Sequence, residues 1–238
     1  MGEQIINFDT DIFLWLNSFH APFWDYFMKT VSSRFIWIGM YLALVIALWK
    51  AYGWKAMLVV LIMTVLAVTC SDQLTASLLR PYFQRLRPAN LDNPLSEFVY
   101  IVGDYRSGPY GFPSSHAANT FALATVMSLV FKRLRFTIAI FGWALLNCYS
   151  RVYLGVHYPG DLMAGMLIGA SIGVVFYLII RYITSNWLHI HTLAREDKPF
   201  DFKILGTNQK VRVVDLVIFI EIITIIWVFI RNTLLFIG

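Results

Sequence analysis

The chain has 238 residues, of which 58% are hydrophobic and only 14% are charged. This composition excludes an ordinary soluble domain and indicates a membrane protein. The formal net charge of +5 is modest, and no basic patch with interleaved aromatic residues points to a nucleic-acid partner. The first residues lack a positive leader, an apolar core and a small-residue cleavage site, so no removable signal peptide is predicted.

Residues 1–34 mix aromatic and aliphatic side chains with Asp, Asn and Pro, which predicts one or two interfacial helices at the membrane surface. Six later segments are apolar enough to predict membrane-spanning helices, at residues 35–54, 56–79, 114–131, 134–148, 161–183 and 213–230. The expected fold is all-α, a polytopic membrane helical bundle of about six transmembrane helices with an N-terminal interfacial helix.

The chain shows no internal repeat and no linker between globular units, so we expect residues 1–238 to form one membrane-embedded domain. In this division, residues 1–34 are interfacial and residues 35–183 form the core. Residues 184–238 supply a polar cytoplasmic loop and the last span.

Several residues inside the predicted spans have specific expectations. Asp72 should face the bundle interior, because hydrocarbon does not tolerate a charge. Glu221 lies near the middle of the last span, where we favour a structural hydrogen bond to a neighbouring helix over a functional role. Gly165, Gly169 and Gly173 recur every four residues, which predicts a small-residue ridge that lets two helices approach closely.

The cysteine and histidine positions argue against a disulfide framework or a metal site. Cys70 and Cys148 both fall within apolar segments, so two free buried thiols are expected. No H-x-x-x-H or C-x-x-C spacing occurs near the polar clusters described below. No metal and no other cofactor is therefore predicted.

The distribution of Lys and Arg between loops predicts the orientation. One side of the membrane should receive residues 1–34, the C-terminus and the loops near 80–112 and 149–160. The other side should receive the loops near 50–55, 132–135 and 181–212, which carry more Lys and Arg once the candidate site arginines are set aside. The positive-inside rule places this second set in the cytoplasm, so the first set faces outward.

Three polar clusters fall at outward-facing ends of predicted spans: Arg80 to Pro88, Pro113 to His116, and Ser150 to Asp161. Guanidinium groups form a planar fork of donors that fits phosphate oxygens, and a helix N-terminus at residue 114 adds free N–H groups. Two histidines among these cations are suited to acid–base and nucleophilic work on an anion. The third cluster alone is equally compatible with a connecting loop that holds a structural salt bridge.

In this order and spacing the clusters resemble the type 2 phosphatidic acid phosphatase superfamily, in its membrane lipid phosphatase branch. The family pattern is K-x6-R-P, then P-S-G-H, then S-R-x5-H-x3-D. The matching stretches here are Arg80-x6-Arg87-Pro88, Pro113-Ser114-Ser115-His116 and Ser150-Arg151-x5-His157-x3-Asp161.

The resemblance implies a role for each matching residue. His157 would be the nucleophile that forms a phosphohistidine, Asp161 would orient it, and His116 would be the general acid for the leaving group. The phosphate would be bound by Arg80, Arg87, Ser114, Ser115 and Arg151. Two positions depart from the family pattern, because Arg80 replaces a lysine and Ser115 replaces a glycine. Arg85 and Arg106 match no motif position and are predicted to contact headgroups or the rim of the substrate site.

The resemblance further implies a lipid phosphate substrate and a bacterial-type inner (cytoplasmic) membrane, with the active site facing the periplasm. Polyprenyl (undecaprenyl) diphosphate and lipid A phosphate are the leading substrates, and phosphatidylglycerol phosphate or phosphatidic acid is the alternative. A non-catalytic anion-binding or transport protein is an alternative interpretation, although no inverted repeat supports it. The sequence does not indicate an oligomeric state.

Overall fold

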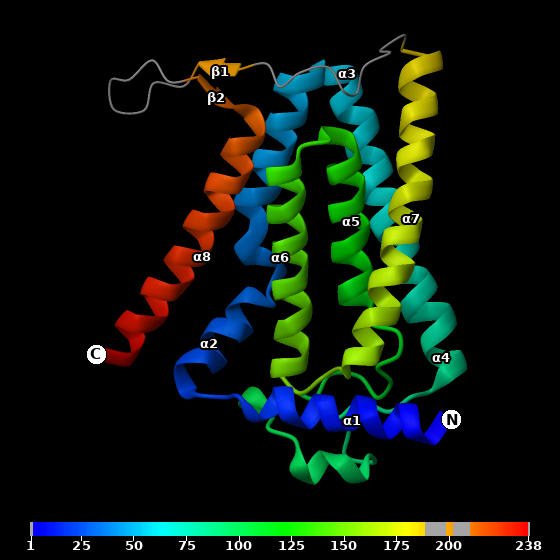
Figure 1. Ribbon diagram of the computed structural model, residues 1–238, viewed down its shortest axis with the longest axis vertical. Coiled ribbons are helices and arrows are strands. Elements are labelled where there is room, and N and C mark those ends of the chain that lie inside the picture. The colour runs from blue at the N-terminus through cyan, green and yellow to red at the C-terminus, as the bar shows by residue number, and fades with distance from the viewer. Residues whose placement is uncertain (1, 189–198, 202–209, 238) are drawn as a thin grey trace.

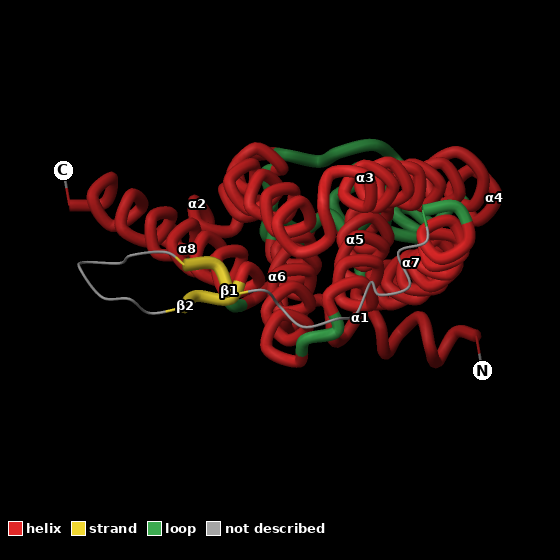
Figure 2. The backbone as a smooth tube through the Cα atoms, turned by 90° about the horizontal axis from the view of Figure 1, so that it is seen from above, coloured by secondary structure: helices red, strands yellow, loops and turns green. Residues whose placement is uncertain are grey.

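The computed structural model describes residues 2–188, 199–201 and 210–237, and its long helices stand side by side as a bundle (Figure 1). These helices are α3 (Ile38–Gln73), α5 (Ser115–Phe131), α6 (Leu134–Tyr153), α7 (Pro159–Asn186) and α8 (Val213–Ile237). Viewed from above, α5 lies among α3, α6 and α7, while α8 extends to one side (Figure 2). The predicted helical bundle is confirmed. A short antiparallel ladder of β1 (Pro199–Asp201) and β2 (Lys210–Arg212) precedes α8, with Phe200 opposite Val211.

Helix α3 consists of two arms, because Gly53 breaks it with φ 81° and ψ 167°. The first arm rises and the second arm descends, and the bend between them lies at the upper end of the bundle (Figure 1). The π-helical turn η2 (Leu74–Leu79) and the short helix α4 (Arg80–Phe83) then extend the second arm toward the lower end of the bundle. The two arms correspond to the first two predicted spans.

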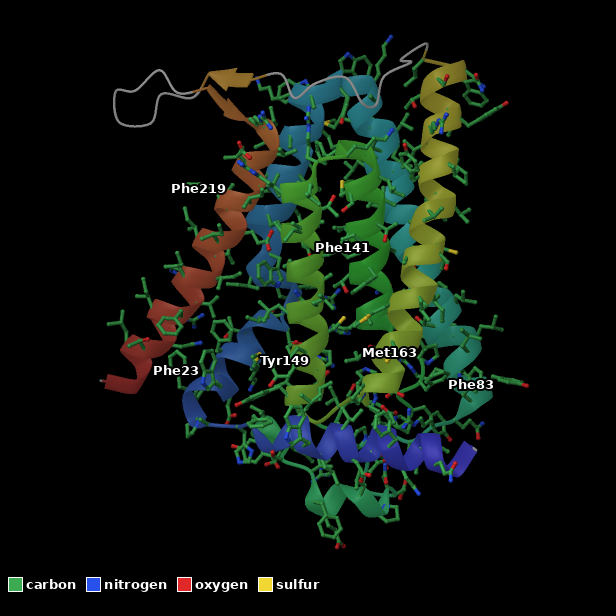
Figure 3. All side chains as sticks on the ribbon, viewed as in Figure 1. Phe23, Phe83, Phe141, Tyr149, Met163 and Phe219 are labelled. Atoms are coloured by element: carbon green, nitrogen blue, oxygen red, sulfur yellow. The ribbon has the colours of Figure 1, made fainter. Side chains whose placement is uncertain are left out.

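Three stretches of helix are long and apolar enough to cross a membrane: Arg34–Phe83, which contains both arms, Pro159–Asn186 and Val213–Leu234. Ser115–Phe131 is a shorter apolar helix. Large apolar side chains such as Phe83 and Phe219 project outward from opposite sides of the bundle (Figure 3). The chain is therefore a multi-pass membrane protein, and the count of six spans stays a prediction.

Two N-terminal helices lie at the lower end of the bundle, α1 (Gly2–Ser18) and α2 (Pro22–Val31). Helix α1 runs across that end, roughly perpendicular to α5 and α6 (Figure 1). It buries Phe13 and Asn17 against the bundle, and Asn17 Nδ2 donates to the carbonyl oxygens of Tyr100 and Tyr153, both at 3.1 Å. Its outer side exposes Phe8 and other apolar residues, an arrangement suited to a helix that lies along a membrane surface.

The glycine ridge of α7 packs directly against α5. A Cβ at Gly165 would meet the Ser114 carbonyl oxygen, and one at Gly173 would lie 2.7 Å from Thr125 Cβ. Gly169 meets the backbone of α5 between these two points. The predicted packing role is confirmed. Because the helices touch along their length, the first turns of α5 and α7 lie together at the lower end of the bundle.

The expectation of two buried thiols is wrong for Cys70, which is exposed, whereas Cys148 is buried. The second arm of α3 buries Ala67 and Ser71 on its inner side, and Cys70 lies on the opposite side of the helix. Asp72 faces inward as predicted, and its Oδ1 accepts a hydrogen bond of 3.0 Å from Asn119 Nδ2.

The predicted hydrogen bond of Glu221 is not found at Oε2. This side chain is only 6% exposed, and its Oε2 has no hydrogen-bond partner within the described part of the chain. The predicted polar cytoplasmic loop at residues 184–212 lies partly outside the described residues, which do not include 189–198 and 202–209.

Candidate active site

The three polar clusters meet at the lower end of the bundle, beneath the first turns of α5 and α7. The first cluster starts in α4 and continues into the following loop, the second begins α5, and the third spans the end of α6 and the start of α7. The backbone N–H of Ser114 donates to the Asp161 carbonyl oxygen at 2.9 Å, which joins the second and third clusters directly.

His157 lies in the connection between α6 and α7 and is only 1% exposed. Its Nε2 is 2.7 Å from Arg87 Nη1, and its Nδ1 is 3.4 Å from Asp161 Oδ2. A guanidinium group can only donate, so Nε2 accepts the bond and the ring proton sits on Nδ1, facing Asp161. Burial and the charges of Arg87, Arg151 and Arg80 lower the pKa of His157 well below its usual value. The ring is therefore neutral, with the lone pair of Nε2 directed at the arginines.

Two glycines make close contacts in the segments around His157. Gly155 has φ +77°, and a Cβ there would lie 2.8 Å from the Tyr100 carbonyl oxygen. This tight turn after α6 delivers His157 to the site. At Gly111, a Cβ would lie 2.8 Å from Asp161 Oδ2 and 3.2 Å from Arg87 Cγ, so only glycine fits beside the His157–Asp161 pair.

Three arginines surround this pair. Arg87 Nη1 also donates to the Val156 carbonyl oxygen at 2.9 Å, and Arg151 Nη1 donates to Ser32 Oγ at 2.6 Å. The Nε atoms of Arg80, Arg87 and Arg151 are all buried and have no hydrogen-bond partner among the described residues. Burial, together with the charges of Arg80 and Arg151, lowers the pKa of Arg87 to about 10, so it stays charged at neutral pH. Unpaired buried donors of this kind are suited to an anionic ligand.

The two departures from the family pattern contact each other. Arg80 Nη2 donates to Ser115 Oγ at 2.7 Å and is 3.4 Å from the Pro113 carbonyl oxygen. Thr75 Oγ1 donates to the same Ser115 Oγ at 2.9 Å. The Ser115 hydroxyl therefore fixes the direction of Arg80, the residue that stands in place of the family lysine.

Ser114 is fully buried at the N-cap of α5. Its Oγ accepts a hydrogen bond from the Ala117 N–H at 3.5 Å, and its own N–H donates to the Asp161 carbonyl oxygen. The structure thus gives Ser114 a capping and bracing position, which orients the first turn of α5.

A cavity of about 570 Å³ opens beside the site, lined by His116 and Arg151. The same cavity is lined by Lys29 and Arg34, and by one acidic residue, Asp72. Part of its wall is apolar, formed by Phe35, Trp37, Val68, Val102, Trp143 and Leu154. His116 is exposed to this space, whereas His157 is buried. The structure therefore brings His116 and Arg151 to the cavity and holds His157, Asp161 and Arg87 in direct contact.

Sequence reasoning missed Arg85 and Asp9. The prediction that Arg85 contacts headgroups or the site rim is wrong, because its Nη1 pairs with Asp161 Oδ1 at 3.0 Å and its Nη2 with Asp9 Oδ2 at 2.7 Å. The backbone of residues 85–87 pairs with that of residues 109–111, as in a strand. Side chains two apart in an extended segment share a face, so the spacing of Arg85 and Arg87 was the available signal.

Arg106 also has an internal contact, since its Nη1 donates to the Ala89 carbonyl oxygen at 2.8 Å and braces the loop. Within the described part of the chain, no three His, Cys, Asp or Glu residues gather as a set of metal ligands.

The chain is similar to two bacterial proteins named lipid A 4'-phosphatase. It is 41% identical to the one from Bacteroides thetaiotaomicron over 209 residues, which cover 88% of this chain and 90% of the relative. It is 33% identical to the one from Porphyromonas gingivalis, over 78% of each chain.

Among solved structures, a PAP2-type phosphatidylglycerolphosphate phosphatase from Bacillus subtilis has the same fold. Its TM-score is 0.53 at 19% identity, and the match covers 77% of this chain and 88% of that one. The family model of the PAP2 superfamily matches residues 55–185, which include all three clusters. This chain belongs to the PAP2 superfamily.

Proposed function

We propose that this chain is an integral-membrane lipid phosphatase that hydrolyses a phosphate or diphosphate on a lipid headgroup through a phosphohistidine intermediate. Its 238 residues act as one membrane-embedded domain in this proposal. The observation that carries it is the contact of Arg87, His157 and Asp161, which presents a neutral imidazole with its Nε2 lone pair among three buried guanidinium groups.

In the first step, His157 Nε2 attacks phosphorus and the bond from phosphorus to the headgroup oxygen breaks. Arg87 releases Nε2 and donates to a phosphate oxygen, and Arg80 and Arg151 donate to the others. Their donors stabilise the charge that develops on these oxygens. The carboxylate of Asp161 stabilises the imidazole as it becomes cationic, because the Nδ1 proton faces it.

His116 lies where a leaving group enters the cavity, and in its protonated form it donates a proton to the departing headgroup oxygen. In the second step it takes a proton from water, whose oxygen attacks phosphorus and frees His157 and inorganic phosphate. All charge stabilisation in both steps comes from side chains and backbone N–H groups of this chain, with no metal ion required.

The 4'-phosphate of lipid A is the preferred substrate in this proposal. The support is the similarity to two proteins of that name along most of the chain. Polyprenyl diphosphate is the second candidate. Both substrates carry apolar chains that stay in the bilayer while the phosphate enters the cavity.

Phosphate release by the purified protein in detergent, with a chelator present, tests the proposal. The panel contains lipid A, undecaprenyl diphosphate, phosphatidylglycerol phosphate and phosphatidic acid. Turnover of at least one of these lipids is expected, with lipid A the fastest. Activity that a chelator abolishes and magnesium restores would remove the metal-independent mechanism, and no turnover of any lipid would remove the proposed function.

We further propose that the protein lies in a bacterial inner membrane with its lower end facing the periplasm. The three clusters, α1 and the C-terminal end of α8 all lie at that lower end, while the bend of α3 and the turn between α5 and α6 lie at the other (Figure 1). A reporter inserted near residue 92 should be external, and one fused after residue 195 should be cytoplasmic. The reverse result would contradict this orientation.

A further inference from the structure

Helix α1 reaches the site through a single carboxylate. Asp9 Oδ2 accepts a hydrogen bond of 2.7 Å from Arg85 Nη2, and Asp9 Oδ1 accepts one of 2.7 Å from the Gly160 N–H. Gly160 directly precedes Asp161, and a Cβ at Gly160 would lie 2.7 Å from Asp9 Oδ2. The carboxylate of Asp9 is thus seated against the first turn of α7, where a larger residue would displace it.

Arg85 connects this carboxylate to Asp161. Its Nη1 donates to Asp161 Oδ1 at 3.0 Å, and its guanidinium carbon is 4.0 Å from the centre of the Tyr158 ring. The other oxygen, Asp161 Oδ2, accepts from the Tyr158 N–H at 3.1 Å and faces His157 Nδ1. Each oxygen of Asp161 therefore has its own fixed donor, and the plane of the carboxylate is determined.

We propose that Asp9 and Arg85 are positioning residues which orient Asp161, and through it His157, for the phosphoryl transfer described above. This inference rests on the proposed function. Arg85 is a long side chain that is 25% exposed, so a bond to Asp161 alone leaves it free to rotate. Asp9, which is 13% exposed, holds the other end of the guanidinium and so fixes its direction.

The test compares Asp9→Asn with Asp11→Asn, which removes the same charge from the exposed side of α1. Because misplacement of a reacting group by about 1 Å can cost up to about 100-fold, we expect Asp9→Asn to lower kcat by about tenfold with KM within about twofold of the wild type. Asp11→Asn should match the wild type. Arg85→Lys should keep more activity than Arg85→Gln, because it retains the charge.

A combined variant tests whether Asp9 acts through Asp161. Adding Asp9→Asn to Asp161→Asn should cause no further loss of kcat, because the orienting carboxylate is already gone. Multiplied losses, or a wild-type kcat for Asp9→Asn, would overturn the inference. If Asp9→Asn does not fold, as judged by its melting temperature, Asp9→Glu replaces it and should show the same fall in kcat. A wild-type protein inactive on every lipid phosphate would instead contradict the proposed function.

A different observation concerns two further cations that line the cavity together with His116. Lys29, at the end of α2, and Arg34, in the short 3₁₀ turn η1 (Arg34–Trp37), both line the 570 Å³ space. Neither forms an ion pair with an acidic side chain in the described residues. Asp72 is the one acidic residue in the lining, and its Oδ1 is bound by Asn119. The cavity thus has cationic charge beyond the three arginines at the phosphate site.

We infer that Lys29 and Arg34 form a subsite for a second anionic group, a phosphate or carboxylate, on the headgroup of the same substrate. A single phosphate fills only a small part of a cavity of this size, which is in the range that encloses a whole small ligand. The adjacent hydroxyls of Ser32 and Ser33 line the same wall and can donate to such a group. This subsite also rests on the proposed function, because it selects among lipid phosphates.

The test uses bisphosphorylated lipid A, with two anionic groups, and phosphatidic acid, with one. Lys29→Gln/Arg34→Gln should raise KM for lipid A about tenfold, the equivalent of about 1.4 kcal/mol, and change KM for phosphatidic acid by less than about twofold. Lys50→Gln/Lys55→Gln is the charge-matched control, at the bend between the two arms of α3, and should leave both KM values unchanged. An equal rise for both lipids, or none for lipid A, would overturn the subsite. A wild-type protein that hydrolyses neither lipid would count against the proposed function.

Discussion

The Nη2 atom of Arg80 lies 2.7 Å from the Oγ atom of Ser115, and these two residues occupy the positions of a lysine and a glycine in the family pattern. The two departures from the family pattern are therefore linked by a direct hydrogen bond. A guanidinium group has more donors than an ammonium: Nη2 of Arg80 binds the serine hydroxyl and the Pro113 carbonyl oxygen, while its Nε has no partner among the described residues and stays available to phosphate.

This pairing predicts that the two positions depend on each other. Ser115→Gly should lower kcat/KM by about tenfold, because Arg80 loses a short hydrogen bond that fixes its direction. Arg80→Lys should cause a similar loss. The double variant Arg80→Lys/Ser115→Gly restores the family pair and should be more active than either single variant. Steady-state rates for the four proteins measure the coupling, and simple multiplication of the two losses would refute it.

Substitution of His157 and substitution of His116 should impair different steps of the reaction. His157→Ala should abolish the phosphoenzyme, because the attacking atom is gone. His116→Ala should slow a lipid alkyl phosphate more than an aryl phosphate, because general-acid help is worth roughly 10²–10⁴-fold when the leaving group is poor. The amount of acid-labile phosphate on protein quenched with labelled substrate measures the phosphohistidine, and steady-state rates on the two substrates measure the effect of His116→Ala. Labelled His157→Ala protein, or equal losses of both substrates in His116→Ala, would mean that the roles are misassigned.

The buried neutral imidazole should make folding stability depend on pH. The pKa of His157 is lowered in the folded protein, so below about pH 6.5 the unfolded chain binds a proton that the folded protein does not. The free energy of unfolding therefore falls as the pH decreases through this range. The melting temperature of His157→Gln should fall less than that of the wild type between about pH 7.5 and pH 5.5. Parallel curves for the two proteins would contradict a lowered pKa.

The contact between α5 and α7 predicts a contrast between two glycines. Gly169→Ala should destabilise the protein by about 1–3 kcal/mol, because the added methyl group meets the Ala118 backbone. Gly142→Ala in α6 meets nothing within 4 Å and should change stability by no more than about 1 kcal/mol, through helix propensity alone. Thermal unfolding in the same detergent compares the two, and similar melting temperatures would contradict the close packing.

Much of this structure could be predicted from local pattern. Hydropathy predicted the long helices, because a helix that crosses a membrane needs a long apolar segment. The four-residue repeat of Gly165, Gly169 and Gly173 predicted a close helix pair. The three clusters were predictable as a site because each lies at the start or end of a helix on the same side of the bundle. Helix ends were less accurate, since α6 continues to Tyr153, beyond the predicted end at 148.

The rest depends on contacts between segments that are remote in sequence. Asp9 and Arg85 are 76 residues apart, and nothing in the sequence near either one indicates a partner. The exposure of Cys70 depends on which side of α3 faces the bundle, and this side is set by the packing of α5 and α7. A hydropathy profile measures how apolar a segment is, and it contains no information about the direction of one side chain.

The mixed wall of the cavity has a kinetic consequence. Phe35 and Val68 line the same space as His116 and Arg151, so one ligand can keep its hydrocarbon against the first pair while its charged end meets the second. A lipid that enters in this way never leaves the bilayer. Its relevant concentration is then its mole fraction in the membrane. Dilution with an inert lipid should slow turnover even when the amount of substrate per volume of sample is unchanged.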